Sequence, residues 1–286
     1  MSVNTRAIVT MLVVGSVGLL SGCATTSNVA PQPGTVVDLL PAEAEARAEA
    51  VRADPIAYVN RVAELCRTLE QYTLTFTRFE RRGFFKRMHG PEHIQCWFRR
   101  SPFSVRMKWL DEDLKYGESA YIEGRHDDKV RFVTRWWTPP LKRPPGINEV
   151  DLMTPVTWGE AKRPLTHFGV ERMMERTLAS LERAGDDVVI GYEGLRQLPD
   201  DGPTAHCIRL EFPASQHKVP IQELYIDVVT DLPVGTVLRL PDGRVDAAYY
   251  YRDIDVGVAL TEADFLLEVE RAATAGSDAH LTSAKE

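Results

Sequence analysis

The first periodic segment of the chain is an amphipathic helix. Asp54 followed by Pro55 fits an N-cap with proline at the first helical position. Apolar residues then recur at helical spacing, at Ile56, Val59, Val62, Ala63, Cys66 and Leu69. We therefore expect a helix from about Pro55 to Glu70 with one face against a core. The strong helix formers at 41–53 predict a further helical stretch before it.

After Gln71 the hydrophobic period changes to two. Tyr72, Leu74 and Phe76 alternate with threonines, as in a strand with one buried face. Residues 83–91 contain two glycines and a proline and predict a wide hairpin turn. Further strands are expected near 94–98, 104–109, 118–123 and 130–136. The first half therefore predicts an antiparallel meander with one apolar face and one charged face.

The second half begins with a proline-rich stretch. Residues 138–166 predict a long irregular loop, a feature that is usually functional or mobile. Residues 168–183 have helical periodicity, and Gly185 is expected to end that helix. Strand patterns then recur at 188–195, 206–212, 221–228, 234–240 and 245–252, and residues 260–265 are expected to lead into a short closing strand.

This order of elements predicts an α+β protein. The strands do not alternate with helices as they do in a doubly wound fold. We expect a strongly curved antiparallel sheet, or unclosed β-barrel, with two main helices packed at its mouth.

The N-terminus carries a candidate export and lipidation signal. An uncharged, mostly apolar run from Ala7 to Leu20 is shorter than the ~20 residues of a membrane span and suits a secretory signal. It ends in Leu-Ser-Gly-Cys, which resembles a bacterial lipobox and implies lipid attachment at Cys23. The alternative is an ordinary signal peptide with a chance cysteine. We expect a lipoprotein signal peptide at 1–22, a flexible tether at 23–37, a folded domain at 38–271 and a disordered tail at 272–286.

Lipidation would place the protein in the cell envelope, anchored to a membrane through Cys23. Ala24, rather than aspartate, follows the cysteine, and by resemblance to sorted lipoproteins this implies the periplasmic face of the outer membrane. With Cys23 acylated, Cys66, Cys96 and Cys207 allow at most one disulfide, and buried free thiols are favoured.

Charge is concentrated in one segment. Nine Lys and Arg and two Glu lie between Arg78 and Lys108, so this segment is +7 in a chain of formal net charge −7. One interpretation is a basic face that contacts anionic lipid or an acidic partner. The other is that these residues point outward from the strands and are only solvated. The candidate membrane or partner contacts are Arg81, Arg82, Lys86, Arg87, Trp136 and Trp137. No nucleic-acid partner is expected.

No pattern of catalytic residues is present. The sequence holds no Gly-x-Ser-x-Gly, His-Glu-x-x-His or phosphate-binding loop motif. His89 and His93 are four residues apart, but at a predicted turn rather than on a helix. We therefore expect a protein that is not an enzyme, with no metal site and no cofactor.

Three segments carry a resemblance to a known family. They are the predicted first strand at Tyr72–Gly83, the passage Phe98–Leu110, and the long run Leu224–Phe265. Together they resemble the LolA/LolB superfamily of lipoprotein carriers, in the lipoprotein branch catalogued as domain-of-unknown-function family 1571. The resemblance spans roughly Pro55 to Leu267 and implies an unclosed barrel with a helical lid and an apolar interior for acyl chains.

These expectations combine into one main hypothesis and one alternative. The main hypothesis is a lipid-anchored periplasmic binding protein that holds acyl chains or a lipidated partner in an apolar cavity, in lipoprotein or lipid trafficking. Strand parity assigns the cavity wall to Leu74, Phe76, Ile94, Phe98, Met107, Trp109, Leu224, Ile226 and Tyr249. The alternative is an envelope sensor or scaffold of the same fold that binds a protein through residues 136–166.

Overall fold

One curved antiparallel sheet forms the body of the protein. The computed structural model describes residues 42–136 and 146–273. Within these ranges eleven strands pair in the order β6-β5-β4-β3-β2-β1-β11-β10-β9-β8-β7. The strands are β1 Gln71–Arg82, β2 Arg87–Arg99, β3 Ser104–Trp109, β4 Tyr116–Ile122, β5 Lys129–Thr134, β6 Ile147–Asp151, β7 Val189–Gln197, β8 Thr204–Glu211, β9 Ile221–Asp227, β10 Pro233–Arg239 and β11 Val245–Asp255.

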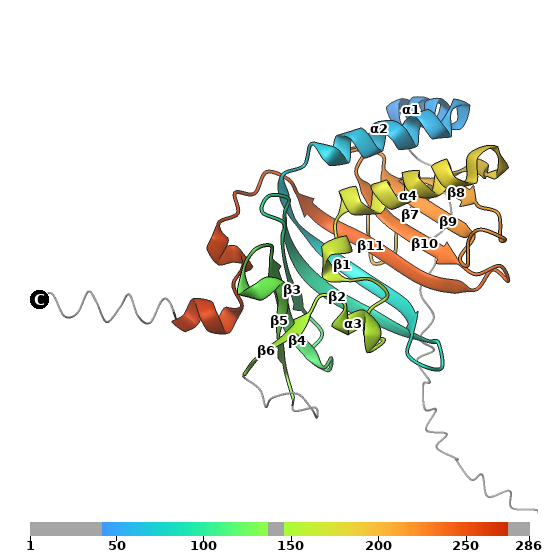
Figure 1. Ribbon diagram of the computed structural model, residues 1–286. Coiled ribbons are helices and arrows are strands. Elements are labelled where there is room, and N and C mark those ends of the chain that lie inside the picture. Colours follow the sequence, from blue (N-terminus) through green and yellow to red (C-terminus); the bar gives the residue numbers. More distant parts are fainter. Residues whose placement is uncertain (1–41, 137–145, 274–286) are drawn as a thin grey trace, which may run out of the picture.

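The sheet consists of two meanders joined in the middle. Strands β1 to β6 extend outward in one direction, and β7 to β11 return until β11 pairs with β1, with Phe76 opposite Tyr251. Strands β6 and β7 remain as the two edges, so the sheet curves without closing (Figure 1). This confirms the expected unclosed antiparallel architecture.

The α-helices are α1 Ala42–Ala53, α2 Pro55–Arg67, α3 Thr154–Thr157 and α4 Val170–Ala184, and a further helical stretch covers 268–273. Short 3-10 turns are η1 His126–Asp128, η2 Leu165–His167, η3 Gly185–Asp187 and η4 Glu262–Phe265. Turn η4 packs on the convex face of β3, where Arg106 donates to the Asp264 carbonyl at 3.2 Å. Helices α2 and α4 run side by side across the concave face (Figure 1). Helix α2 begins as predicted, with the Asp54 carboxylate accepting the Ala57 N–H at 2.9 Å, but it ends at Arg67 rather than at residue 70.

The main core lies between the concave face and these two helices. Alternate strand residues meet the buried faces of α2 and α4, and among them Tyr72, Leu74 and Ile94 are 1% exposed or less. Each buried apolar side chain of this size contributes about 1.5–3 kcal/mol relative to exposure. The alternation in the sequence therefore identified the inward face of β1 correctly.

The convex face of the second meander is apolar as well. Tyr225 on β9 and Tyr250 on β11 pack beside Gly235 of β10, where an added Cβ would lie 3.0 Å from the Tyr250 ring. Val237 and Ala248 are fully buried in the same cluster. Strands β9 and β10 of this half are therefore buried on both faces.

The proline-rich stretch is more ordered than the sequence predicts. Residues 147–151 form β6, which pairs with β5 at the sheet edge, and 154–157 form the one-turn helix α3. The expectation of an irregular loop over 138–166 is therefore wrong for this part. The local pattern is too short to signal a strand, and pairing with β5 supplies the backbone hydrogen bonds that define it.

Three smaller expectations are corrected. Residues 260–265 do not lead into the expected closing strand: they contain the 3-10 turn η4, and 268–273 are helical. A capping box between Thr261 and Asp264, with the Thr261 N–H donating to the Asp264 carboxylate at 2.7 Å, favours this helical start. The hairpin turn expected at 83–91 is shorter, since β2 already begins at Arg87. Helix α4 begins at Val170 rather than at residue 168.

Candidate functional site

A large cavity lies under α4 and beside α3. Its volume is about 600 Å³. The apolar part of its wall comes from β1, β3, β4, β5, β11 and the start of α4, with Phe76, Met107, Trp109, Tyr116, Phe132, Phe168, Met173 and Tyr251. The sheet therefore presents one aromatic, curved surface to the interior, and the segment from α3 to α4 covers it.

The structure separates the nine side chains expected at the cavity wall into two groups. Four of them line the cavity, namely Phe76, Met107, Trp109 and Tyr249. The other five face the same side of the sheet but pack into the closed core, namely Leu74, Ile94, Phe98, Leu224 and Ile226. Strand parity decides the face, whereas the position of the covering helices decides which part of that face stays open.

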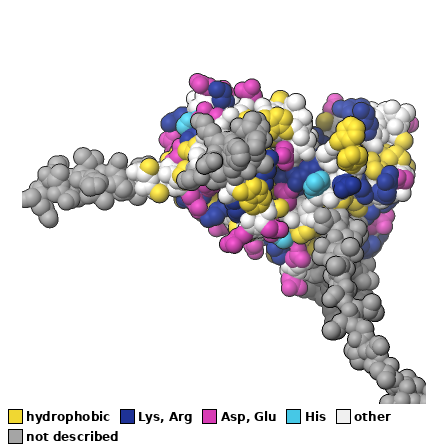
Figure 2. All heavy atoms as spheres, turned by 90° about the horizontal axis from the view of Figure 1, so that it is seen from below, with side chains coloured by type: hydrophobic (Ala, Val, Ile, Leu, Met, Phe, Trp, Pro, Cys, Tyr) yellow, Lys and Arg dark blue, Asp and Glu magenta, His cyan; other side chains and the backbone are white. Residues whose placement is uncertain are grey.

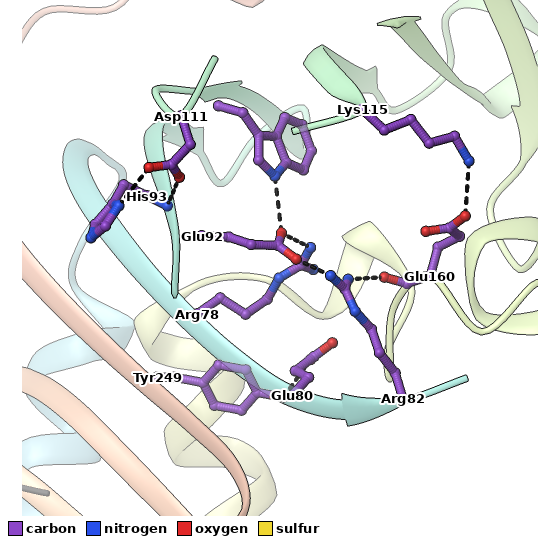
Figure 3. A network of polar contacts seen from close by, with 10 residues as sticks. Arg78, Glu80, Arg82, Glu92, His93, Asp111, Lys115, Glu160 and Tyr249 are labelled. Atoms are coloured by element: carbon purple, nitrogen blue, oxygen red, sulfur yellow. Dashed lines mark hydrogen bonds and ion pairs between the residues drawn. The ribbon is translucent and has the colours of Figure 1, made fainter. Parts of the chain in front are cut away.

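A buried ionic cluster forms the polar end of the concave face. Glu92 on β2 is 4% exposed and lies between two arginines of β1. Arg78 Nη2 is 2.5 Å from Glu92 Oε2, and Arg82 contacts the other carboxylate oxygen. The indole N–H of Trp109 donates to Glu92 at 3.1 Å (Figure 3). Burial, and then the neighbouring Arg78, lower the pKa of Arg82 to about 10.

This cluster also fixes the segment that covers the cavity. Arg82 donates to the backbone carbonyl of Glu160, which follows α3, and the Lys115 ammonium lies 2.9 Å from the Glu160 carboxylate (Figure 3). The β1–β2 hairpin and the turn before β4 therefore hold the covering segment from two sides.

Two polar groups of the cavity wall have unused hydrogen-bonding capacity. The Tyr249 hydroxyl donates to Glu80 Oε1 at 2.6 Å, while Glu80 Oε2 and Arg78 Nε are buried with no protein partner in the described part of the chain. Burial, reinforced by Glu80, raises the pKa of Tyr249 well above its usual value, so the tyrosine remains a donor. One acceptor and one donor beside the cavity are thus left without a protein partner in the described residues.

Cations gather where the cavity meets solvent. Arg163, Arg183 and Lys218 are exposed lining residues, and within the described ranges none of them forms an ion pair. Arg176 is half-buried and donates to the His167 carbonyl at 2.9 Å. Burial, and then the neighbouring Arg163, lower the pKa of Arg176 below its usual value.

By contrast, the acidic lining residues are already engaged. Asp246 pairs with Lys162, Glu160 with Lys115, and Glu80 accepts from Tyr249. The exposed rim of the cavity is therefore positive, although the chain as a whole is negative at −7.

The described residues contain neither a cluster of metal-binding side chains nor a disulfide. In residues 42–136 and 146–273 no three His, Cys, Asp or Glu side chains are grouped to hold a metal ion. Cys66, Cys96 and Cys207 are buried free thiols, so none of the three pairings left open by the sequence forms. No helix in the described ranges is both long and apolar enough to span a membrane.

The expected contact residues fall in different environments. Lys86 and Arg87 are exposed at the hairpin tip, and Trp136 is 42% exposed. Arg81 donates to the Val245 carbonyl at 2.6 Å, and Arg82 points inward to Glu92. Two further expected residues, Trp137 and the lipid-bearing Cys23, lie outside the described residues.

The sequence reasoning missed several wall residues. Arg78 and Glu80 continue the inward parity of Phe76, so the alternation extended by two steps would have found them. Phe168 reaches the cavity from the segment before α4, and Arg176 reaches it from α4 itself. No signal in the sequence states which strand that helix covers.

Comparison with known proteins adds structural neighbours of low sequence identity. Crystal structures that align with this chain include MucB, with 15% identity over 75% of this chain and a TM-score of 0.45. The lipoprotein LppX of Mycobacterium tuberculosis aligns with 12% identity over 73% of this chain and all of its own, with a TM-score of 0.41. A LolA superfamily protein of Nitrosomonas europaea aligns with 9% identity over 74% of this chain and 97% of its own, with a TM-score of 0.30. The chain spans 63% of the length of MucB.

No curated protein matches the chain. Residues 69–272 match the family described as protein of unknown function DUF1571, the branch expected from the sequence, and the chain belongs to that family.

Proposed function

We propose that this protein binds the acyl chain of a lipid or of a lipidated partner in the cavity under α4, without covalent chemistry. The cavity itself is the observation that carries this proposal. Its volume of about 600 Å³ lies within the ~300–1,000 Å³ that ligand sites usually occupy, and nine Phe, Trp and Tyr residues line it. Burial contributes about 0.8 kcal/mol per methylene, so a chain is held firmly yet can move to a competing apolar site.

The charge of the rim supports an anionic head group on that chain. Arg163, Arg176 and Arg183 lie around the opening without carboxylate partners in the described ranges. A carboxylate or phosphate placed there would offset their mutual repulsion, while the chain enters the aromatic part of the cavity.

We further propose that the protein acts in the cell envelope, tethered through lipidated Cys23 at the periplasmic face of the outer membrane. The N-terminal sequence ending at that cysteine supports this part. Mass analysis of the N-terminal peptide from membrane-purified protein tests it. An unmodified Cys23, or a chain that retains residues 1–22, would refute the tether.

Native mass spectrometry and lipid extraction of the full protein purified from membranes test the cavity. We expect a bound acyl species beyond the covalent lipid. Ser119 lines the cavity and is 7% exposed, so Ser119→Phe should occupy part of the space and reduce the amount of bound species. Ser215→Phe, at an exposed position outside the cavity, is the matched control. Circular dichroism confirms that both variants fold.

A protein that is empty, and that also ignores added lipopeptide and phospholipid, would overturn the acyl-binding proposal. It would favour the protein-binding sensor, with residues 136–166 as the next target. The role of the rim cations in binding the head group is tested by comparing the affinity for a fatty acid with the affinity for its methyl ester. Arg176→Gln should weaken binding of the acid on the order of tenfold, equivalent to about 1.4 kcal/mol, and leave the ester unchanged.

A further inference from the structure

The tip of the β1–β2 hairpin exposes two aromatic rings to solvent. Phe84 is 92% exposed and Phe85 is 75% exposed, and their rings meet edge to face with centroids 5.1 Å apart. Burial of a phenylalanine side chain stabilises a folded protein, so two adjacent phenylalanines exposed on a turn forgo that stabilisation. The basic-residue pattern in the sequence drew attention to the neighbouring cations and not to these rings.

Positive charge surrounds the two rings. Lys86 and Arg87 are both exposed and form no ion pair within the described residues, and the Arg87 guanidinium lies 5.5 Å from the centroid of the Phe85 ring. Aromatic rings flanked by unpaired cations match the interface of an anionic bilayer, where rings enter the acyl boundary and cations remain among the head groups.

The hairpin tip adjoins the covering segment of the cavity. A Cβ added at Gly159 would lie 3.6 Å from Gly83 of the turn, and Arg82 donates to the Glu160 carbonyl. Between these contacts and α3 lies Trp158, which is 47% exposed and lines the cavity. Figure 1 places the hairpin tip and α3 at the same end of the molecule. Figure 2 views the molecule from below and shows hydrophobic side chains beside Lys and Arg side chains.

We infer that the Phe84–Phe85 hairpin tip inserts into an anionic lipid bilayer and brings the opening of the cavity to the membrane surface. This goes beyond the proposed function, because docking depends on the tip and does not require a chain in the cavity. The occupant of the surface is the bilayer itself, since the exposed cations complement its charge and the exposed rings its apolar interior.

An environment-sensitive fluorophore at the tip tests this in the full protein purified from membranes. Phe84→Cys provides the attachment site, and the wild type is the labelling blank because Cys66, Cys96 and Cys207 are buried. Val229→Cys is the matched control, since Val229 is 76% exposed in the β9–β10 turn. Each labelled protein is reconstituted into vesicles of phosphatidylethanolamine with phosphatidylglycerol, and separately into phosphatidylcholine vesicles.

With the anionic vesicles we expect a blue shift and quenching by a lipid-soluble quencher at position 84 and neither at position 229. Adding K86Q and R87Q, or raising the salt concentration, should reduce the shift. An emission at position 84 that remains as in water would overturn the inference. So would a blue shift that appears without vesicles as the protein concentration rises, because it would assign the tip to a second copy of the chain.

The result is separable from the fate of the acyl-binding proposal. The Ser119→Phe variant, which narrows the cavity, should dock with the same blue shift as the protein with Ser119. Membrane docking by a protein whose cavity is empty would support insertion of the hairpin tip and refute acyl binding. An acyl species in the cavity of a protein whose tip stays in water would support acyl binding and refute insertion of the tip.

Discussion

The hydroxyl oxygen of Tyr72 accepts the backbone N–H of Val170 at 3.0 Å and so caps helix α4 from a strand 98 residues earlier. Gly169, the N-cap residue, has no side chain to do this, and a Cβ there would lie 3.0 Å from the Tyr72 hydroxyl and from the Phe98 ring. The contact joins the first strand to the helix that covers the cavity. It is a tertiary substitute for a local cap.

The first prediction follows from this contact. Tyr72→Phe removes the acceptor and leaves the Val170 N–H buried, which should lower the free energy of unfolding by about 1–3 kcal/mol in urea titrations. Tyr121→Phe is the matched control, because the Tyr121 hydroxyl contacts only Asp128, at 3.3 Å and near the surface. Equal losses in the two variants would contradict a capping role.

The second prediction concerns the buried cluster around Glu92. Glu92→Gln leaves Arg78 and Arg82 close together without the carboxylate between them, so unfolding should become easier by about 3–5 kcal/mol. The control is Glu49→Gln, which breaks an exposed pair with Arg52 and should leave the urea midpoint unchanged. A midpoint for Glu92→Gln that matches the control would show that the cluster does not stabilise the fold.

The third prediction concerns thiol reactivity. Burial raises the pKa of Cys66 and of Cys207 to about 12 and that of Cys96 well above its usual value. The folded full chain carrying Cys23→Ser should therefore react with an aromatic disulfide reagent at pH 8 only as fast as it unfolds. All three thiols should react at once in denaturant. Rapid reaction of any thiol in the native protein would be inconsistent with this structure.

The fourth prediction is a dependence of stability on pH from His206. This side chain is 0% exposed, and its Nδ1 lies 3.0 Å from the Tyr192 hydroxyl. Burial is the main cause that lowers its pKa below the usual 6.5. The neutral ring therefore contributes stability above pH 6.5 that is lost as the pH falls, because the unfolded chain takes up a proton that the folded chain refuses.

The comparison that isolates His206 is the melting temperature of the wild type and of His206→Gln between pH 7 and pH 5. The wild type should lose more of its stability over this range. His89, His167 and His217 also have lowered pKa values, but they are present in both proteins and cancel in the difference. Parallel pH profiles would rule out His206 as the cause.

The sequence by itself determined the local elements. The alternation of Tyr72, Leu74 and Phe76 fixed the inward face of β1, and the apolar spacing after Pro55 fixed helix α2. Such patterns are read from neighbours in the chain, because a strand or helix has a fixed side-chain period. Within each half of the chain the strands follow one another without intervening helices, and this order predicted the antiparallel sheet that does not close.

Tertiary structure alone decided where the cavity lies. Leu74 and Phe76 have the same parity on the same strand, yet Leu74 packs under the helices and Phe76 lines open space. The difference comes from where α4 crosses the sheet, and that position depends on long-range contacts such as Tyr72 with Val170. The formation of β6 and the inward orientation of the Arg82 side chain also depend on tertiary contacts. Their partners, β5 and Glu92, are set by pairing across the sheet rather than by the residues next to them in the chain.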